Sequence, residues 1–157
     1  MKSQKILNEK EKNEIVEKLR EQFGISEVPG KIIMRGKERL FLYSGSFDDE
    51  EMENLESIVF IERAGIYFAK IDEATGEIRL SIEGTQILGS QIKKNIFEIP
   101  ENLVEDWMKG RELNVQSGMR GFVVVKYKNE FLGTGKASEN KIGNFIPKNR
   151  RLKDKTG

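Results

Sequence analysis

Two residue types are missing from this sequence of 157 residues: it contains neither cysteine nor histidine. Without cysteine the chain has no disulfide framework, no thiolate nucleophile and no cysteine-ligated zinc site. Without histidine it lacks the commonest metal ligand and the commonest general base near neutral pH. These absences argue against an enzyme, and we expect no catalytic residue, no bound metal and no cofactor.

Long apolar runs are missing as well. No segment approaches the roughly 20 apolar residues that a membrane-spanning helix requires, and the first residues, MKSQKILNEKEKNE, lack the apolar stretch of a secretory signal. We therefore expect a cytoplasmic protein without a membrane partner.

Charge is abundant but unevenly distributed. From Met1 to Gln116 there are 17 basic and 23 acidic residues, a balance of −6, whereas Ser117 to Gly157 holds 10 basic and 3 acidic residues, a balance of +7. A basic end on an acidic body is typical of a protein that presents one face to a polyanion. Charge alone agrees equally well with a solvated tail.

The residue pattern predicts an α+β protein that begins with a helix. Asn8 and Glu11 have the spacing of a capping box, and Gly24 is a natural stop. The other elements predicted in the N-terminal half are a hairpin of Lys31–Arg35 and Glu38–Tyr43 over a two-residue Gly36-Lys37 turn, an acidic helix at Phe47–Leu55, strands at Ser57–Ile61, Ile66–Ile71 and Glu77–Ser81, and a helical turn at Gly84–Gly89.

The C-terminal half is predicted to be richer in strands. Its expected elements are a strand at Asn95–Ile99, a helix from Pro100 to Gly110, strands at Gly121–Lys128, Phe131–Ser138 and Lys141–Ile146, a tight Asn129-Glu130 turn, and a basic tail from Pro147. The continuous valines of Gly121–Lys128 predict burial on both faces. We place a boundary between an N-terminal α+β region, residues 1–93, and a β-rich region, residues 94–157.

Three motifs in this half are candidates for binding. Glycines alternate in Leu132-Gly133-Thr134-Gly135-Lys136, which suits either close approach of a base or phosphate, or a bulge. The tail Ile146–Lys153 carries cations that can neutralise phosphates, and its Pro147 and Leu152 suggest that it folds back. Lys109 and Arg111 flank a helix-ending glycine, where cations also compensate the helix dipole.

The aromatic residues are expected to be mostly core, although one or two near Phe145 are candidates for stacking on bases. The aromatic residues considered are Tyr43, Tyr67, Phe68, Tyr127, Phe131 and Phe145.

The order of these features resembles a known family. A helix ending in Trp107-Met108-Lys109-Gly110-Arg111-Glu112 is followed by Gly121–Val125, then Leu132–Lys136, then Ile146-Pro147-Lys148 with Arg150-Arg151. This order is similar to the PUA-like domain that follows the catalytic domain in Sun/Fmu-type RNA cytosine methyltransferases, and to small ribosome-biogenesis proteins with a C-terminal PUA domain. The resemblance covers roughly residues 62–153.

The resemblance implies a β pseudo-barrel that binds structured RNA, either rRNA or tRNA. The residues that it places at the RNA are Lys109, Gly110, Arg111, Arg120, Gly133, Gly135, Lys136, Lys148, Arg150 and Arg151. The chain departs from the methyltransferases because it has no glycine-rich cofactor loop and no cysteine to attack a cytosine.

Two functions remain open from the sequence. The first is a non-catalytic RNA-binding protein in ribosome biogenesis or RNA modification, working with an RNA-modifying enzyme or a pre-ribosomal particle and not with DNA. The alternative is an adaptor that docks on an RNA enzyme or ribosomal protein through its acidic half, around Asp48–Glu53.

Overall fold

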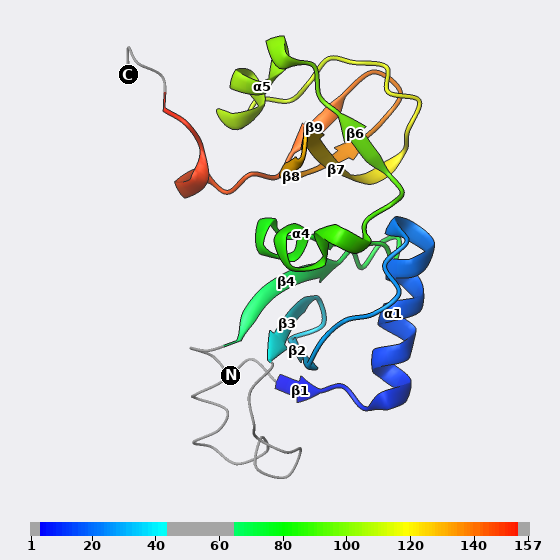
Figure 1. The fold of residues 1–157 in the computed structure, drawn as a ribbon. Coiled ribbons are helices and arrows are strands. Elements are labelled where there is room, and N and C mark those ends of the chain that lie inside the picture. The colour runs from blue at the N-terminus through cyan, green and yellow to red at the C-terminus, as the bar shows by residue number, and fades with distance from the viewer. Residues whose placement is uncertain (1–3, 44–64, 154–157) are drawn as a thin grey trace.

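The structure is a computed structural model that describes residues 4–43 and 65–153. It contains helices and two separate β-sheets, so the predicted α+β class is confirmed (Figure 1). The predicted acidic helix at Phe47–Leu55 and strand at Ser57–Ile61 lie outside the described residues. Within the described ranges, no helix is both long and apolar enough to cross a bilayer.

The N-terminal region is built on a five-stranded antiparallel sheet with strands in chain order. Its elements are β1 (Gln4–Ile6), α1 (Glu9–Phe23), β2 (Lys31–Arg35), β3 (Arg39–Tyr43), β4 (Ile66–Ile71) and β5 (Ile78–Leu80). A helix α4 (Ile82–Leu88) and a 3₁₀ turn (Gly89–Gln91) follow. Strand β5 is an edge of this sheet. Helix α4 lies between β4 of the first sheet and the second sheet (Figure 1).

Helix α1 forms as its sequence predicts. The Glu11 amide donates to Asn8 Oδ1 at 2.9 Å, and the Asn8 amide donates to Glu11 Oε1 at 3.1 Å, which completes the capping box. Gly24 ends the helix in the left-handed conformation, with φ of 81°. The buried face, which includes Leu19 and Phe23, packs into the main hydrophobic core.

The C-terminal region contains a four-stranded sheet in the order β6-β7-β8-β9. Its elements are β6 (Ile96–Glu98), α5 (Glu101–Met108), β7 (Gly121–Tyr127), β8 (Glu130–Ala137), β9 (Ile142–Asn144) and a 3₁₀ turn (Lys148–Arg150). Strands β6 and β7 pair in parallel. A parallel pair needs a long crossover, and α5 with the loop that follows it supplies that connection.

Strand β7 is buried on both faces, as its valines predict. Phe122 and Val124 belong to the core shared with α1 and the first sheet. Val123 and Val125 belong to a second core around Trp107 of α5. Apolar contacts therefore cross from one region to the other, while the proposed boundary at residue 93 stays a prediction.

Two turns differ from their predicted positions. The β2–β3 loop holds three residues, because Arg35 pairs with Arg39 in the strand register, and Gly36 at its start has φ of 65°. The β7–β8 turn lies at Lys128-Asn129 instead of Asn129-Glu130, with Lys128 in the left-handed region at φ of 54°.

Helix α4 begins before Gly84, because Ser81 caps it by accepting the Gly84 amide at 2.9 Å.

The capping box yields a test of stability. Replacing Asn8 by alanine leaves the Glu11 amide without its partner, and such losses cost about 1 kcal/mol. We expect chemical denaturation to show this decrease in unfolding free energy. Asn114→Ala, at an exposed position, should change it by less than about 0.5 kcal/mol. Equal effects of the two substitutions would contradict the assigned role of Asn8.

Candidate nucleic-acid interface

The C-terminal end of α5 is shaped around a glycine. Gly110 has φ of 89°, a conformation that L side chains rarely adopt, and its amide donates to the Trp107 carbonyl at 2.9 Å. A Cβ atom at this position would overlap the Arg151 side chain. Gly110 therefore serves both the end of the helix and the docking of the tail.

The tail folds back on α5, as Pro147 and Leu152 suggested. Arg151 Nε donates to the Ile146 carbonyl at 2.8 Å, and the Leu152 amide donates to the Met108 carbonyl at 2.8 Å. The Asn144 side chain donates to the carbonyls of Trp107 at 2.8 Å and Arg111 at 3.0 Å. These hydrogen bonds join the end of α5 to strand β9 and to the tail.

Cations gather where these segments meet, and we call this the C-terminal basic surface. Its members are Lys109, Arg111, Lys148, Arg151 and Lys153. Lys109 and Arg111 have acidic neighbours on α5, at 3.6 Å to Glu105 and 2.7 Å to Asp106. Lys148 and Lys153 are exposed, and no ion pair joins either of them to another residue in the described part of the chain. Exposed cations without a partner are well suited to neutralise phosphates.

Arg150 points away from this surface toward α4. Its guanidinium lies 2.6 Å from Glu83 Oε1. Partial burial raises the pKa of Glu83, but the hydrogen bond from Arg150, a bond from its own amide and the charge of Arg150 together hold that pKa below its ordinary value of 4.5. Arg150 therefore joins the tail to the N-terminal region, and any contact that it makes with RNA stays a prediction.

The two glycines of β8 face Trp107. The indole Nε1 donates to the Leu132 carbonyl at 2.7 Å. Gly133 has φ of 106°, and a Cβ atom on it would lie 3.0 Å from Ile146 Cγ1 and 3.9 Å from that nitrogen. A Cβ atom on Gly135 would lie 2.9 Å from Trp107 Cη2 and 2.5 Å from the Gly143 carbonyl oxygen. Both glycines are buried. Packing accounts for them, which favours the structural interpretation over an open strand edge for RNA.

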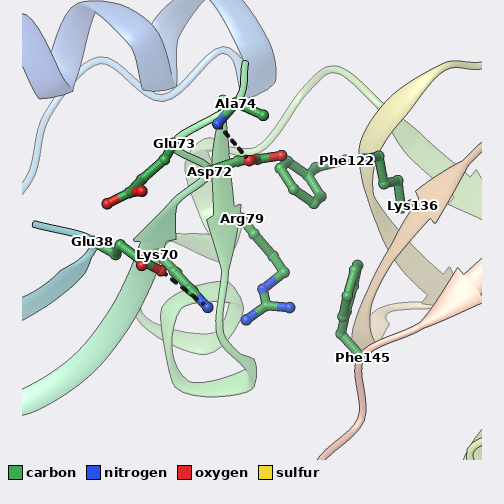
Figure 2. Close-up of a pocket in the computed structure, with 9 residues that line it drawn as sticks. All are labelled: Glu38, Lys70, Asp72, Glu73, Ala74, Arg79, Phe122, Lys136 and Phe145. Carbon is green, nitrogen blue, oxygen red and sulfur yellow. Dashed lines mark hydrogen bonds and ion pairs between the residues drawn. The ribbon is translucent and has the colours of Figure 1, made fainter. Parts of the chain in front are cut away.

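Lys136 and Arg120 lie apart from the C-terminal basic surface. Side chains alternate along a strand, so the neighbour of Gly135 faces the opposite side of the sheet. Lys136 there lines a pocket between the two sheets, with its Nζ 5.7 Å from the Phe122 ring centroid (Figure 2). Arg120 is exposed just before β7. The predicted residues therefore divide into separate groups.

Arg79 and Lys70, which no sequence motif indicates, line the same pocket as Lys136. Arg79 lies over Phe145, with 4.2 Å between its guanidinium carbon and the ring centroid. The sequence predicts stacking for residues near Phe145, but nothing local to Arg79 in the sequence indicates the position of Arg79. Only the packing of β5 against the second sheet brings the two together.

Comparison with known proteins assigns the second region. Residues 94–152 match the family model described as the Methyltransferase RsmF PUA domain. This region is a PUA-like domain. Over 61 residues the chain is 31% identical to proteins named ribosomal RNA small subunit methyltransferase F, from Vibrio vulnificus strains YJ016 and CMCP6.

The similarity covers part of the chain and a small part of each relative. It covers 39% of the chain but 13% of the length of each of these relatives, and the matched family model describes a PUA domain and not a catalytic one. The predicted resemblance to the PUA domain of Sun/Fmu-type methyltransferases is confirmed.

The packing of the β8 glycines is testable with a matched pair. Gly135→Ala places a methyl group against Trp107 and the Gly143 carbonyl, and such overpacking costs about 1–3 kcal/mol. Gly143→Ala on the adjacent strand meets nothing nearer than 3.8 Å, so we expect a change below about 1 kcal/mol. Chemical denaturation of both variants would measure their unfolding free energies. Equal values would contradict the close packing of Trp107 against Gly135.

The link between Arg150 and Glu83 predicts a change in titration. Arg150→Ala removes the hydrogen bond and the charge that lower the pKa of Glu83, so we expect NMR titration to show that pKa rising. Because the pKa is lowered in the folded state, the stabilisation by this pair is present above pH 4.5 and is lost as the pH falls through the folded value. Lys148→Ala should leave the Glu83 titration unchanged, and a similar rise there would contradict the specific pairing.

Proposed function

We propose that this protein binds structured RNA, rRNA or tRNA, without catalysing a reaction, and that it serves RNA modification or ribosome assembly in the cytoplasm. The observation that carries the proposal is the match of residues 94–152 to the PUA domain of an rRNA methyltransferase. Its partners would be the RNA itself and an RNA-modifying enzyme or a pre-ribosomal particle.

The geometry of the C-terminal basic surface supports this proposal. Lys148 and Lys153 are exposed beside Arg151, on a tail whose Leu152 amide donates to the Met108 carbonyl at the end of α5 and whose Arg151 guanidinium donates to the Ile146 carbonyl. A cation on an ordered backbone loses less entropy when it meets a phosphate than one on a free tail. Phosphate contacts of this kind supply affinity and position without reading sequence.

Support for a non-catalytic role comes from chemistry that the chain lacks. Cysteine and histidine are absent from the whole sequence. In the part that the structure describes, no three acidic residues form a group that could hold a metal ion. The alternative role as an adaptor depended on Asp48–Glu53, which lies outside that part.

The proposal predicts RNA binding that depends on salt and on the tail. We expect binding of an rRNA fragment to weaken steeply with salt concentration, because each neutralised phosphate releases counterions. Lys148→Ala combined with Lys153→Ala should weaken binding several-fold and reduce the salt slope by roughly 1–2. Titrations of fluorescently labelled RNA at several salt concentrations would measure both. Adding Arg151→Ala should weaken binding further.

The matched control removes two lysines elsewhere. Lys10 is on α1 and Lys93 contacts the end of that helix; both are exposed. Helix α1 and the tail lie on opposite sides of the molecule (Figure 1). Lys10→Ala with Lys93→Ala makes the same change in net charge and should alter affinity by less than about twofold. Equal weakening by both pairs would contradict a specific surface, and no binding of any RNA would contradict the function.

A further inference from the structure

The pocket beside Lys136 lies between the two sheets, where the edge strand β5 meets β7 and the end of β9 (Figure 2). Strand register places two cross-strand pairs around it. Lys70 of β4 is opposite Arg79 of β5, and Phe122 of β7 is opposite Lys136 of β8. Phe145, just after β9, completes the aromatic side. Both regions of the protein therefore contribute to one concave site of about 430 Å³.

The guanidinium of Arg79 is held by an aromatic ring and not by a carboxylate. Its carbon lies 4.2 Å from the Phe145 centroid, and the Phe122 ring is 6.0 Å from Phe145 at an angle of 59°. Within residues 4–43 and 65–153, nothing accepts a hydrogen bond from Arg79 or forms an ion pair with it. Its planar face and its donors are thus oriented and available to a ligand.

Charge in the pocket is divided between two sides. The cationic side has Arg79 and Lys136 next to the rings, and no described residue forms an ion pair with Lys136. The acidic side comes from the β3 and β4 ends. There Glu38 pairs with Lys70 at 3.2 Å, and Asp72 Oδ1 accepts the Ala74 amide at 3.0 Å.

Glu73 extends the acidic side as an exposed carboxylate (Figure 2). A ligand that matches both sides carries an anion at one end and hydrogen-bond donors at the other. A simple anion meets only the cationic side.

We propose that this inter-sheet pocket binds one unpaired RNA nucleotide whose base carries an exocyclic amine. The base stacks on the Arg79–Phe145 platform, its phosphate lies near Lys136, and its amine donates to the carboxylates opposite. Aromatic rings and arginine planes are the usual platforms for unpaired bases, and carboxylates accept from amines such as cytosine N4. The inference rests on the proposed RNA binding and deepens it.

The size and the surroundings of the pocket agree with this ligand. Its volume is within the range of small-molecule sites and is too small for a duplex. A second hollow adjoins it and shares Glu38 and Lys70, with Lys37 and Arg39 on its rim. Arg39 itself lies 5.7 Å from the Tyr67 ring centroid. The backbone of neighbouring nucleotides has a cationic path along the β2–β3 hairpin.

The test compares three RNA hairpins with one stem sequence: fully paired, with one bulged cytidine, and with one bulged uridine. We expect the intact protein to prefer the bulged cytidine. Arg79→Ala should weaken binding of that RNA about 10-fold, the scale of one lost base stack. Its affinity for the paired stem should change by less than about twofold, because that RNA does not enter the pocket.

Controls separate stacking from charge and from folding. Arg79→Lys keeps the charge but not the plane, so it should retain less than half of the preference for the bulged cytidine. Thermal unfolding of each variant checks that the fold persists. Phe145→Leu, which keeps an apolar side chain, is a second test of the platform and should lower the same preference.

The outcomes distinguish this inference from the proposed function. Equal affinity of the intact protein for the paired and bulged hairpins would contradict nucleotide binding in the pocket. The same conclusion would follow if Arg79→Ala weakened binding of all three hairpins equally. If the Lys148 and Lys153 variant still loses affinity in that case, the proposed function stands without the pocket. Absence of binding to all three hairpins and to rRNA would contradict the proposed function.

Discussion

Burial of β7 on both faces is the constraint on which the rest of the structure depends. Its alternating side chains belong to two cores, with Phe122 and Val124 on one side and Val123 and Val125 on the other. A strand in this position cannot slip by one residue without exchanging the two sets. That fixed register determines where the neighbouring strand presents its glycines and its lysine.

As a result, the two faces of β8 contact different parts of the protein. One face receives Trp107, whose indole donates to Leu132 and requires Gly135 to have no side chain. This contact holds α5 in place, and the end of α5 in turn accepts the tail through Met108. The other face carries Lys136 into the inter-sheet pocket. Lys136 and the basic residues of the tail thus lie on separate surfaces of the protein.

Local features could be predicted from the sequence, and features that depend on distant pairing could not. The capping box of α1 and the bounds of β4 rest on residues a few positions apart. The two-sided burial of β7 followed from its valines. In contrast, the hydrogen bond from the Ile71 amide to the Glu38 carbonyl joins β4 to the β2–β3 loop across more than 30 positions of the chain. The position of Arg79 over Phe145 depends on how two sheets pack, which no local pattern shows.

The alternating glycines of β8 agree with two interpretations at the level of sequence, a binding site and a packing requirement. In a strand, a glycine that leaves room for a ligand cannot be distinguished by sequence pattern from a glycine that leaves room for a packed tryptophan. The side chain that lies opposite the glycine in the folded protein shows which of the two applies. In this protein the partner of Gly135 is Trp107, 28 positions earlier along the chain.

We propose that the PUA-like domain contacts RNA through the C-terminal basic surface, together with the inter-sheet pocket. Ultraviolet crosslinking of the protein to rRNA, followed by mass spectrometry of the crosslinked peptides, tests it most directly. We expect crosslinks in the segments around Lys109–Arg111, Phe145 and Lys148–Lys153. Crosslinks confined to α1, or spread evenly over the surface, would contradict it.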